Sequence, residues 1–403
     1  MFASQPLAML RHLFTFNSGD TLLISTKTLM VHGSLLASAL ATAAVASRAQ
    51  TPNPTPTGAV VLVISSAGRD SGRTHPGFEM DELSQAYHLF TTNGFTVTIA
   101  SPAGGAVEAD RFDRSVDYNA RFLADPNAMQ LLGNTRRTAR LRAQDFDAIF
   151  VIGGKGAMFD LPLDTALARF AGDMFDRGAI VSAVCHGPAG LVRARTRDGR
   201  ALLANRAVTG FSNEEETVFG EQWASQFAFL LEDEIRSVGA HWQEAPLMLP
   251  HVAVDGRVIT GQNPYATAGT VEAVIVALGK TPAARAPWRD ERSVNFAAYA
   301  LRNDPTVVRR ELAATHGDMQ PDLIGMIGYY QLQVASDTVA VRRALTLLEL
   351  AAPYMPHVEV SLGLADAYLR LGRANDARVL VRDVLARHPE RKDAQALLAR
   401  LNN

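Results

Sequence analysis

A cysteine followed directly by a histidine is the first chemically suggestive feature of this chain, because Cys185 is the only cysteine among its 403 residues. The pair lies in the pentapeptide "AVCHG", where small residues flank it. A thiol beside an imidazole can act as a nucleophile with its general base. A lone cysteine is also often a small apolar residue of a core, so neighbouring motifs must decide between the two roles.

The sequence around Cys185 is typical of a nucleophile elbow. The apolar run from Ile180 to Val184 predicts a buried strand, and the residues after the pentapeptide predict a helix. A turn tight enough to admit only small neighbours would hold the central side chain above the sheet. The positive end of the following helix would favour the thiolate.

A glycine-rich turn could supply further groups to such a thiol. The stretch "VIGGKG" predicts a strand that ends at Gly153 and Gly154. The N–H of Gly154, with that of Val184 or His186, could bind a developing oxyanion. A plain glycine loop is the alternative interpretation.

Acidic residues follow two other predicted strands. The stretch "TGFSNEEET" contains Glu214, Glu215 and Glu216, one of which could orient an imidazole. Glu82 begins a predicted helix after the first strand and could point to the same sheet edge. In isolation such acids are more typical of solvated helix starts, where the helix dipole favours them.

Strand and helix patterns alternate from Gly58 to Lys280 and position these motifs. Apolar runs that end in turn residues, separated by amphipathic stretches, predict a doubly wound, mostly parallel α/β sheet of the flavodoxin-like kind. In such a sheet ligands bind at the carboxyl ends of the strands. The stretch "HVAVDGRVITGQNP" predicts a hairpin with an Asp-Gly turn.

The strand pattern ends near Pro282, so we expect an α/β domain over 58–282 and a smaller all-α region over 283–403. The stretch "PWRDERSV" is expected to be a charged connection. The segment from Ser361 to Glu390 matches one tetratricopeptide repeat, 328–356 resembles a degenerate copy, and 393–401 is expected to cap the array. Repeats of this kind bind peptides or proteins on a concave face, although an ordinary helical appendage is the alternative.

The N-terminal residues predict export. An apolar stretch over 35–46 has the length of a signal-peptide core and is too short for a membrane span. We therefore expect residues 1–49 to be a signal peptide or N-terminal extension and 50–57 to be a Pro/Thr-rich linker. The mature chain would be periplasmic or secreted, without a membrane span, and a chain lacking a functional signal would stay cytoplasmic.

Composition narrows the remaining functional classes. Hydrophobic residues make up 47% of the chain and charged residues 20%, as in ordinary globular proteins with ample core. A formal net charge of −2 gives no electrostatic reason to expect nucleic acid or an anionic membrane as a partner. One cysteine excludes an intrachain disulfide framework and a cysteine-rich zinc module.

Taken in order, the motifs resemble the ThiJ/PfpI superfamily of class I glutamine amidotransferase-like proteins. They are most similar to its glutathione-independent glyoxalase III and heat-shock chaperone branch. The resemblance rests on "MDELSQAYHLFTTNGFTVTIASPAGG", "FVIGGKGAMFDLP", "AVCHGPAGLV", "VTGFSNEEETVFG" and "VITGQNPYA".

This resemblance implies a role for each matching residue. Cys185 would be the nucleophile, and His186 the histidine that follows it. Glu82 matches the acid that hydrogen-bonds the thiol, and Glu216 best matches the carboxylate that orients the histidine.

The glycine turn also matches, with one departure. Gly153 and Gly154 correspond to the oxyanion side of the site, but Lys155 replaces the histidine of the usual "GGHG". A flexible cation at this position would alter substrate preference or hold an anionic product.

The implied reaction is a lyase reaction that converts methylglyoxal to lactate without glutathione, metal or organic cofactor. Family membership further implies a role in stress-related carbonyl detoxification and a homodimer. Three alternatives stay open: an amidase or peptidase built on Cys185, His186 and Glu216, a stress chaperone whose cysteine is oxidised, and an interaction module based on the C-terminal helices.

Overall fold

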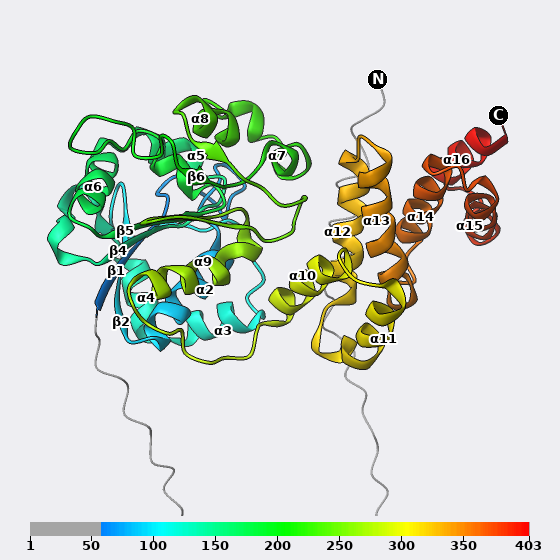
Figure 1. The fold of residues 1–403 in the computed structure, drawn as a ribbon, viewed down its shortest axis with the longest axis horizontal. Helices are drawn as coiled ribbons and strands as arrows, with labels where there is room; N and C mark the ends of the chain where they lie inside the picture. The colour runs from blue at the N-terminus through cyan, green and yellow to red at the C-terminus, as the bar shows by residue number, and fades with distance from the viewer. Residues whose placement is uncertain (1–57, 403) are drawn as a thin grey trace, which may run out of the picture. The chain divides into compact units, whose positions relative to one another are not determined.

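The structure, a computed structural model, describes residues 58–402. An α/β domain comes first and a series of helices follows (Figure 1). The expected signal peptide (1–49) and linker (50–57) lie outside the described residues. Across 58–402, every helix is too short or too polar to span a lipid bilayer.

The α/β domain is built on the mostly parallel sheet that the sequence predicts. Within residues 58–402 this sheet has seven strands in the order β3-β2-β1-β4-β5-β9-β8. β1 pairs in parallel with β2 on one side and β4 on the other, whereas β8 and β9 are antiparallel. The strands are β1 (Gly58–Val63), β2 (Phe95–Ser101), β3 (Arg136–Arg137), β4 (Ala148–Val151), β5 (Ile180–Val184), β8 (Val252–Asp255) and β9 (Val258–Gly261), and a separate small sheet pairs β6 (Ala207–Val208) with β7 (His241–Trp242).

Helices cover both faces of this sheet (Figure 1). α2 packs on β1 and β2, α9 packs on β5 and β9, and the two helices contact each other. α6 lies against β4 and β5 on the opposite face. The helices of this domain are α2 (Met80–Thr92), α3 (Asp117–Ala124), α4 (Pro126–Gly133), α5 (Ala157–Asp160), α6 (Thr165–Asp176), α7 (Asn213–Phe219), α8 (Leu231–Ser237) and α9 (Thr267–Ala277).

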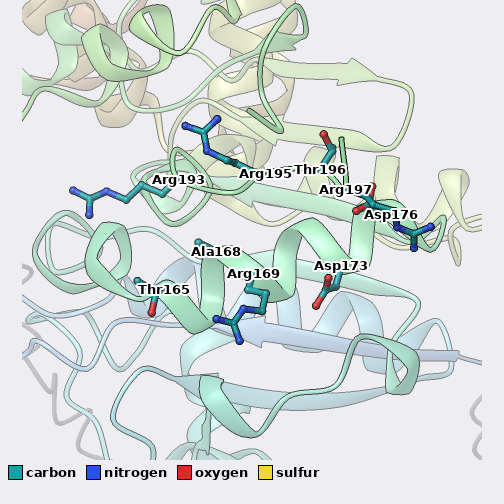
Figure 2. A pocket seen from close by; sticks show the side chains of 9 residues that line it. All are labelled: Thr165, Ala168, Arg169, Asp173, Asp176, Arg193, Arg195, Thr196 and Arg197. Carbon is teal, nitrogen blue, oxygen red and sulfur yellow. The ribbon is translucent and has the colours of Figure 1, made fainter. Parts of the chain in front are cut away.

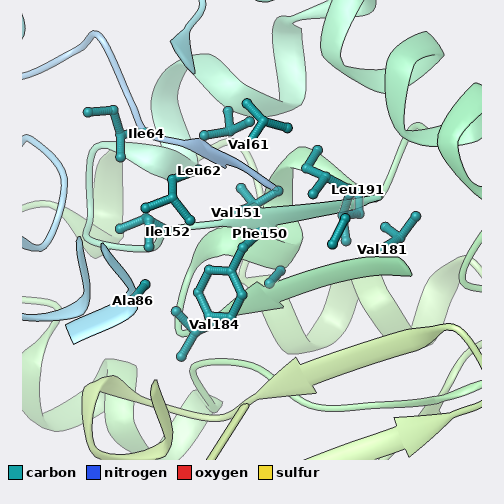
Figure 3. Packing of buried hydrophobic residues seen from close by; sticks show 14 of the residues in the cluster. Val61, Leu62, Ile64, Ala86, Phe150, Val151, Ile152, Val181, Val184 and Leu191 are labelled. Atoms are coloured by element: carbon teal, nitrogen blue, oxygen red, sulfur yellow. The ribbon is translucent and has the colours of Figure 1, made fainter. Parts of the chain in front are cut away.

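The core between these layers explains why the strand sequences are continuous apolar runs rather than alternating ones. Figure 3 shows side chains of β1, β4 and β5, among them Leu62, Phe150 and Val181, packed together. All three are fully buried, because both faces of the sheet are covered. Full burial of such a side chain contributes about 1.5–3 kcal/mol.

Chain order places the topological switch point of the sheet between β1 and β4. The chain passes outward from β1 through β2 to β3, and then returns to place β4 and β5 on the other side of β1. A crevice forms at such a point, outside the carboxyl ends of the strands. The predicted hairpin is also present, since Asp255 pairs with Val258 around Gly256.

The region after the α/β domain is helical, as predicted. α14 and α15 coincide with the expected tetratricopeptide repeat, α12 and α13 with its degenerate copy, and α16 with the expected cap. Ala365 and Ala377 are fully buried where α14 meets α15. The helices are α10 (Arg289–Ala300), α11 (Pro305–Thr315), α12 (Pro321–Val334), α13 (Thr338–Ala351), α14 (Val358–Arg370), α15 (Ala374–Arg387) and α16 (Lys392–Asn402).

The expected connection "PWRDERSV" is wrong for all but its first two residues, because α10 begins at Arg289. The Glu291 carboxylate accepts a hydrogen bond from the backbone N–H of Trp288 at 3.1 Å and so satisfies a donor at the helix start. A glutamate three residues after the N-cap marks a helix start, but within a run of charged residues this signal resembles a solvated connection.

Candidate active site

Cys185 occupies the tight turn after β5 that its small neighbours predict. Its backbone is in the left-handed region, with φ +58°, which costs a non-glycine residue about 1–3 kcal/mol. A Cβ on Gly187 would lie 2.2 Å from the carbonyl oxygen of Val151, so the turn has no room for a side chain there. The surroundings therefore hold Cys185 in a strained position, where it lines a pocket.

The segment after this turn differs from the prediction. β5 leads into a single 3₁₀ turn, Gly187–Gly190, and not into an α-helix. Two glycines and Pro188 within four residues disfavour a longer helix. The expected stabilisation of the thiolate by a helix dipole is therefore wrong, since one short turn sums few peptide dipoles.

The side chains of Cys185, His186 and Glu216 form a connected row. The Sγ atom of Cys185 lies 3.4 Å from Nδ1 of His186, and Nε2 of His186 lies 2.8 Å from Oε2 of Glu216. A carboxylate next to Nε2 favours the tautomer with its proton there, which leaves Nδ1 free to accept the thiol proton. His186 and Glu216 are both buried, 2% and 6% exposed, so the row is shielded from solvent.

The local sequence explains why Glu216 faces inward. Ser212 caps α7, and Glu215 closes a capping box by accepting a hydrogen bond from the Ser212 N–H at 3.1 Å. The three acids thus separate by position: Glu214 is exposed, Glu215 is buried in the cap, and Glu216 reaches His186. The solvated helix start expected of such a run applies to Glu214 alone.

Glu82 lies in the first turn of α2, directed at the same sheet edge. Its Oε2 atom accepts a hydrogen bond from the backbone N–H of Gly153 at 2.7 Å. Burial raises the pKa of Glu82 well above its usual range, and the nearby Glu79 raises it further. The carboxyl of Glu82 also interacts with the thiol of Cys185, whose pKa is raised by burial and by the charge of Glu82. Because both pKa values are raised, the Glu82 carboxyl and the Cys185 thiol favour their protonated forms.

The two glycine amides serve different partners. The N–H of Gly153 is committed to Glu82, so the prediction that Gly153 helps to bind an oxyanion needs correction. The N–H of Gly154 hydrogen-bonds Cys185 and lowers the pKa of its thiol. A Cβ on Gly153 would lie 2.6 Å from the backbone N atom of His186. A side chain at this position would therefore push the glycine turn after β4 away from the turn that holds Cys185.

A pocket of about 240 Å³ opens onto the thiol. Lys155 lines it, with its Nζ atom 3.8 Å from Oε2 of Glu221. The ring of Phe211 covers the imidazole of His186 at 4.4 Å between centroids. Within the described residues, no group of three His, Cys, Asp or Glu side chains is arranged to hold a metal ion.

Several pocket residues were missed by sequence reasoning. Glu79 and Asp81 flank the predicted helix start and could have been found as acids next to Glu82. Asp110 comes from a loop and Tyr265 from the 3₁₀ turn Pro264–Ala266, and no local pattern marks them. Burial raises the pKa of Glu79 to about 8 and that of Asp81 to about 6.

A second hollow, of about 450 Å³, lies beside α6 and has a different character (Figure 2). It is lined by Arg169, Arg193, Arg195 and Arg197. Figure 2 shows these guanidinium groups pointing in different directions rather than at one point. No cysteine lines this hollow, so the pocket at Cys185 is the candidate active site.

A profile of the DJ-1/PfpI family matches residues 74–275, which is half of the chain. The matched range includes Glu82, Cys185 and Glu216. The chain belongs to the DJ-1/PfpI family. A tetratricopeptide-repeat profile matches residues 340–401, in agreement with α13 to α16.

Similar proteins point to one branch of this family. The chain is 30% identical over 221 residues to the glutathione-independent glyoxalase hsp3102 of Schizosaccharomyces pombe. This match covers 50% of this chain and 89% of that protein. It is 33% identical over 205 residues to glyoxalase 3 of Candida albicans, covering 49% of this chain and 87% of that protein.

Solved structures agree with this fold. The crystal structure of glyoxalase III from Candida albicans matches with a TM-score of 0.50 and 26% identity, over 55% of this chain and 98% of that one. The 24 kDa rapid encystment protein of Francisella tularensis matches with a TM-score of 0.51 and 28% identity, over 55% and 99%. The helical region is thus an addition to the part shared with these proteins.

Proposed function

We propose that this protein is a glutathione-independent glyoxalase that converts methylglyoxal and water to lactate. The observation that carries the proposal is the position of Cys185 between Glu82 on one side and the His186–Glu216 pair on the other. Relatives named as glyoxalases share about 30% identity and support the same activity class.

The first step is addition of the Cys185 sulfur to the aldehyde carbon of methylglyoxal. His186 accepts the thiol proton at Nδ1, 3.4 Å away, while Glu216 stabilises the resulting imidazolium. The aldehyde oxygen gains that proton and the product is a hemithioacetal. The N–H of Gly154 supports the sulfur while it carries negative charge.

The second step moves a proton between the two oxygen-bearing carbons. A base removes the hydrogen from the hemithioacetal carbon, an enediol forms, and the neighbouring carbon takes up a proton. Glu82 is suited to this exchange, because burial raises its pKa, so that the carboxyl can hold a proton, and because it interacts with the Cys185 thiol to which the substrate is bound. The isomerised adduct is a lactoyl thioester, which water cleaves to lactate and the free thiol.

The test compares wild type with Cys185→Ser in the absence of glutathione. Loss of methylglyoxal and formation of lactate are measured together. We expect wild type to form one lactate per methylglyoxal consumed and the variant to form none above the uncatalysed rate. Unchanged lactate formation by the variant would show that Cys185 is not the nucleophile.

A hydrolase acting on amides is the second candidate, favoured by the unbroken row from Cys185 through His186 to Glu216. Such a row activates thiols for attack on acyl groups. A panel of peptide and amino-acid anilides separates the two candidates. Release of aniline that depends on Cys185, without lactate formation from methylglyoxal, would favour the hydrolase.

For the helical region we propose binding of a peptide or protein partner. The tetratricopeptide match over 340–401 supports this, because stacked helix pairs form extended binding surfaces. Selection of peptides on the immobilised full chain tests it. Enrichment of a common motif is expected, and a selection that enriches none would argue against the proposal.

A further inference from the structure

One wall of the active-site pocket comes from the helical region. Asp290, the second residue of α10, lines the same pocket as Cys185. Its Oδ2 atom accepts a hydrogen bond from the hydroxyl of Tyr118 on α3 at 2.8 Å. Tyr118 is only 2% exposed, so this bond fixes the position of Asp290 against the α/β domain.

α12 strengthens the same attachment at another side of the pocket. Nε2 of Gln331 donates a buried hydrogen bond to the carbonyl of Leu247 at 2.9 Å. The next residue, Met248, lines the pocket with a left-handed backbone, φ +64°. The ring of Tyr330 packs edge-on against Phe219, another pocket residue, at 5.0 Å between centroids. The helical region is therefore built into the rim of the pocket.

Asp290 adds a carboxyl to a pocket that already has several. Glu79, Asp81 and Asp110 also line it. Burial raises the pKa of the Tyr265 hydroxyl, and the nearby charges of Asp290, Asp81 and Glu79 raise it further, so all three carboxyls act on one point in the pocket. Lys155 supplies the opposing charge, but its ammonium lies beside Glu221.

The uncharged groups of the pocket add to this character. The Nδ2 atom of Asn263 donates to Glu215 and to the carbonyl of Leu249. Its Oδ1 atom is buried and has no hydrogen-bond partner within the described part of the chain. Both amide hydrogens of Asn263 are thus committed within the protein, so this pocket residue offers no free N–H donor to an anion.

We propose that Asp290 is a specificity-determining residue, by which the helical region makes the pocket exclude anionic carbonyl compounds and admit uncharged ones. The inference rests on the proposed function in naming the substrate class of that site. An anion entering the pocket would lose hydration and meet carboxylates of like charge, whereas methylglyoxal has no charge to be repelled. Glyoxylate, an aldehyde with a carboxylate, represents the excluded class.

Alkylation of Cys185 tests the charge selection without relying on turnover. Iodoacetamide and iodoacetate have nearly the same size and differ by one negative charge, and the only cysteine makes intact mass a direct readout. Rates are measured on the full chain at pH 8 and divided by those of N-acetylcysteine. We expect wild type to discriminate against iodoacetate, and Asp290→Asn to raise the iodoacetate-to-iodoacetamide ratio about tenfold.

Two variants control for structure and for net charge. Asp290→Glu keeps the charge and should keep the wild-type ratio. Asp318→Asn removes the same charge from an exposed residue of the helical region that pairs with Arg292, and should also leave the ratio unchanged. A ratio in Asp290→Asn equal to that of wild type, or an equal rise in Asp318→Asn, would overturn the proposal.

Turnover then separates this inference from the proposed function. The ratio of kcat/KM for glyoxylate to that for methylglyoxal should rise about tenfold in Asp290→Asn. Turnover of methylglyoxal with an unchanged ratio would refute the role of Asp290 and leave the glyoxalase assignment intact. Charge-selective alkylation without any turnover of methylglyoxal would refute the glyoxalase assignment and leave the role of Asp290 intact.

Discussion

Replacement of Glu215 by glutamine should change how the stability of the α/β domain depends on pH. The Glu215 carboxyl is buried and accepts hydrogen bonds from the Ser212 N–H, from the Met248 N–H at 3.2 Å and from Nδ2 of Asn263 at 2.7 Å. It thus joins α7, which carries Glu216, to the loop at Met248. Burial raises its pKa to about 7.

The sign and size of the effect follow from this shift. A carboxyl whose pKa is higher in the folded state binds its proton more tightly there, so its contribution is fully present below about pH 4.5 and is lost as the pH rises through 7. Between pH 5 and pH 8 the wild-type protein should lose about 2–3 kcal/mol of unfolding free energy through Glu215. Glutamine cannot ionise, so the Glu215→Gln variant lacks this pH-dependent contribution to the unfolding free energy.

Glutamine also lacks one acceptor, which adds a pH-independent cost. Its amide nitrogen would face a backbone N–H that Glu215 now satisfies, at a cost of about 1–3 kcal/mol. Glu215→Gln should therefore be less stable than wild type at pH 5, and the difference should shrink by about 2–3 kcal/mol at pH 8.

Urea unfolding at pH 5 and pH 8, followed by tryptophan fluorescence, measures this difference. All three tryptophans precede α10 and report on the α/β domain and its boundary. Glu214→Gln, the exposed neighbour, is the matched control and should show a much smaller pH-dependent change. A difference between wild type and Glu215→Gln that is the same at both pH values would refute the reasoning.

Three further substitutions test other parts of the account. Glu82→Gln should lower kcat for methylglyoxal by about 10²–10⁴-fold, because the amide cannot exchange the proton, while its oxygen still accepts from Gly153; retained kcat would exclude Glu82 from proton transfer. Gly187→Ala should destabilise the protein by at least about 1–3 kcal/mol in urea unfolding, since the added methyl meets a backbone carbonyl; an unchanged midpoint would contradict the packing described for the elbow. Ser212→Ala should cost about 1 kcal/mol through loss of the α7 cap and should lower activity through Glu216; equal stability and activity would argue against that support.

The parts of this protein that local patterns determine were predictable. Strands such as β1 and β5 are apolar runs bounded by turn residues, and the small residues around Cys185 predicted its tight turn. Since carboxyl ends of parallel strands meet at one edge, the convergence of Glu82 and Glu216 on that edge was also predictable.

Features that depend on tertiary contacts were not predictable in the same way. The Gly153 amide could not be assigned to Glu82 from spacing, because two strand ends must first be placed side by side. Asp290 lies more than a hundred residues from Cys185 in the sequence, and its hydrogen bond to Tyr118 spans 172 residues. The absence of an α-helix after Cys185 was predictable from local sequence, because Pro188 lies between Gly187 and Gly190 in the 3₁₀ turn.

The most direct test of the central claim is the intact mass of the protein during turnover of methylglyoxal, followed by peptide mapping. The account predicts an adduct with the mass of one methylglyoxal on the peptide that contains Cys185, which forms before lactate and disappears as lactate is released. Cys185→Ala should show neither adduct nor lactate. Lactate formation at the wild-type rate by Cys185→Ala, or an adduct that maps elsewhere in the chain, would contradict the account.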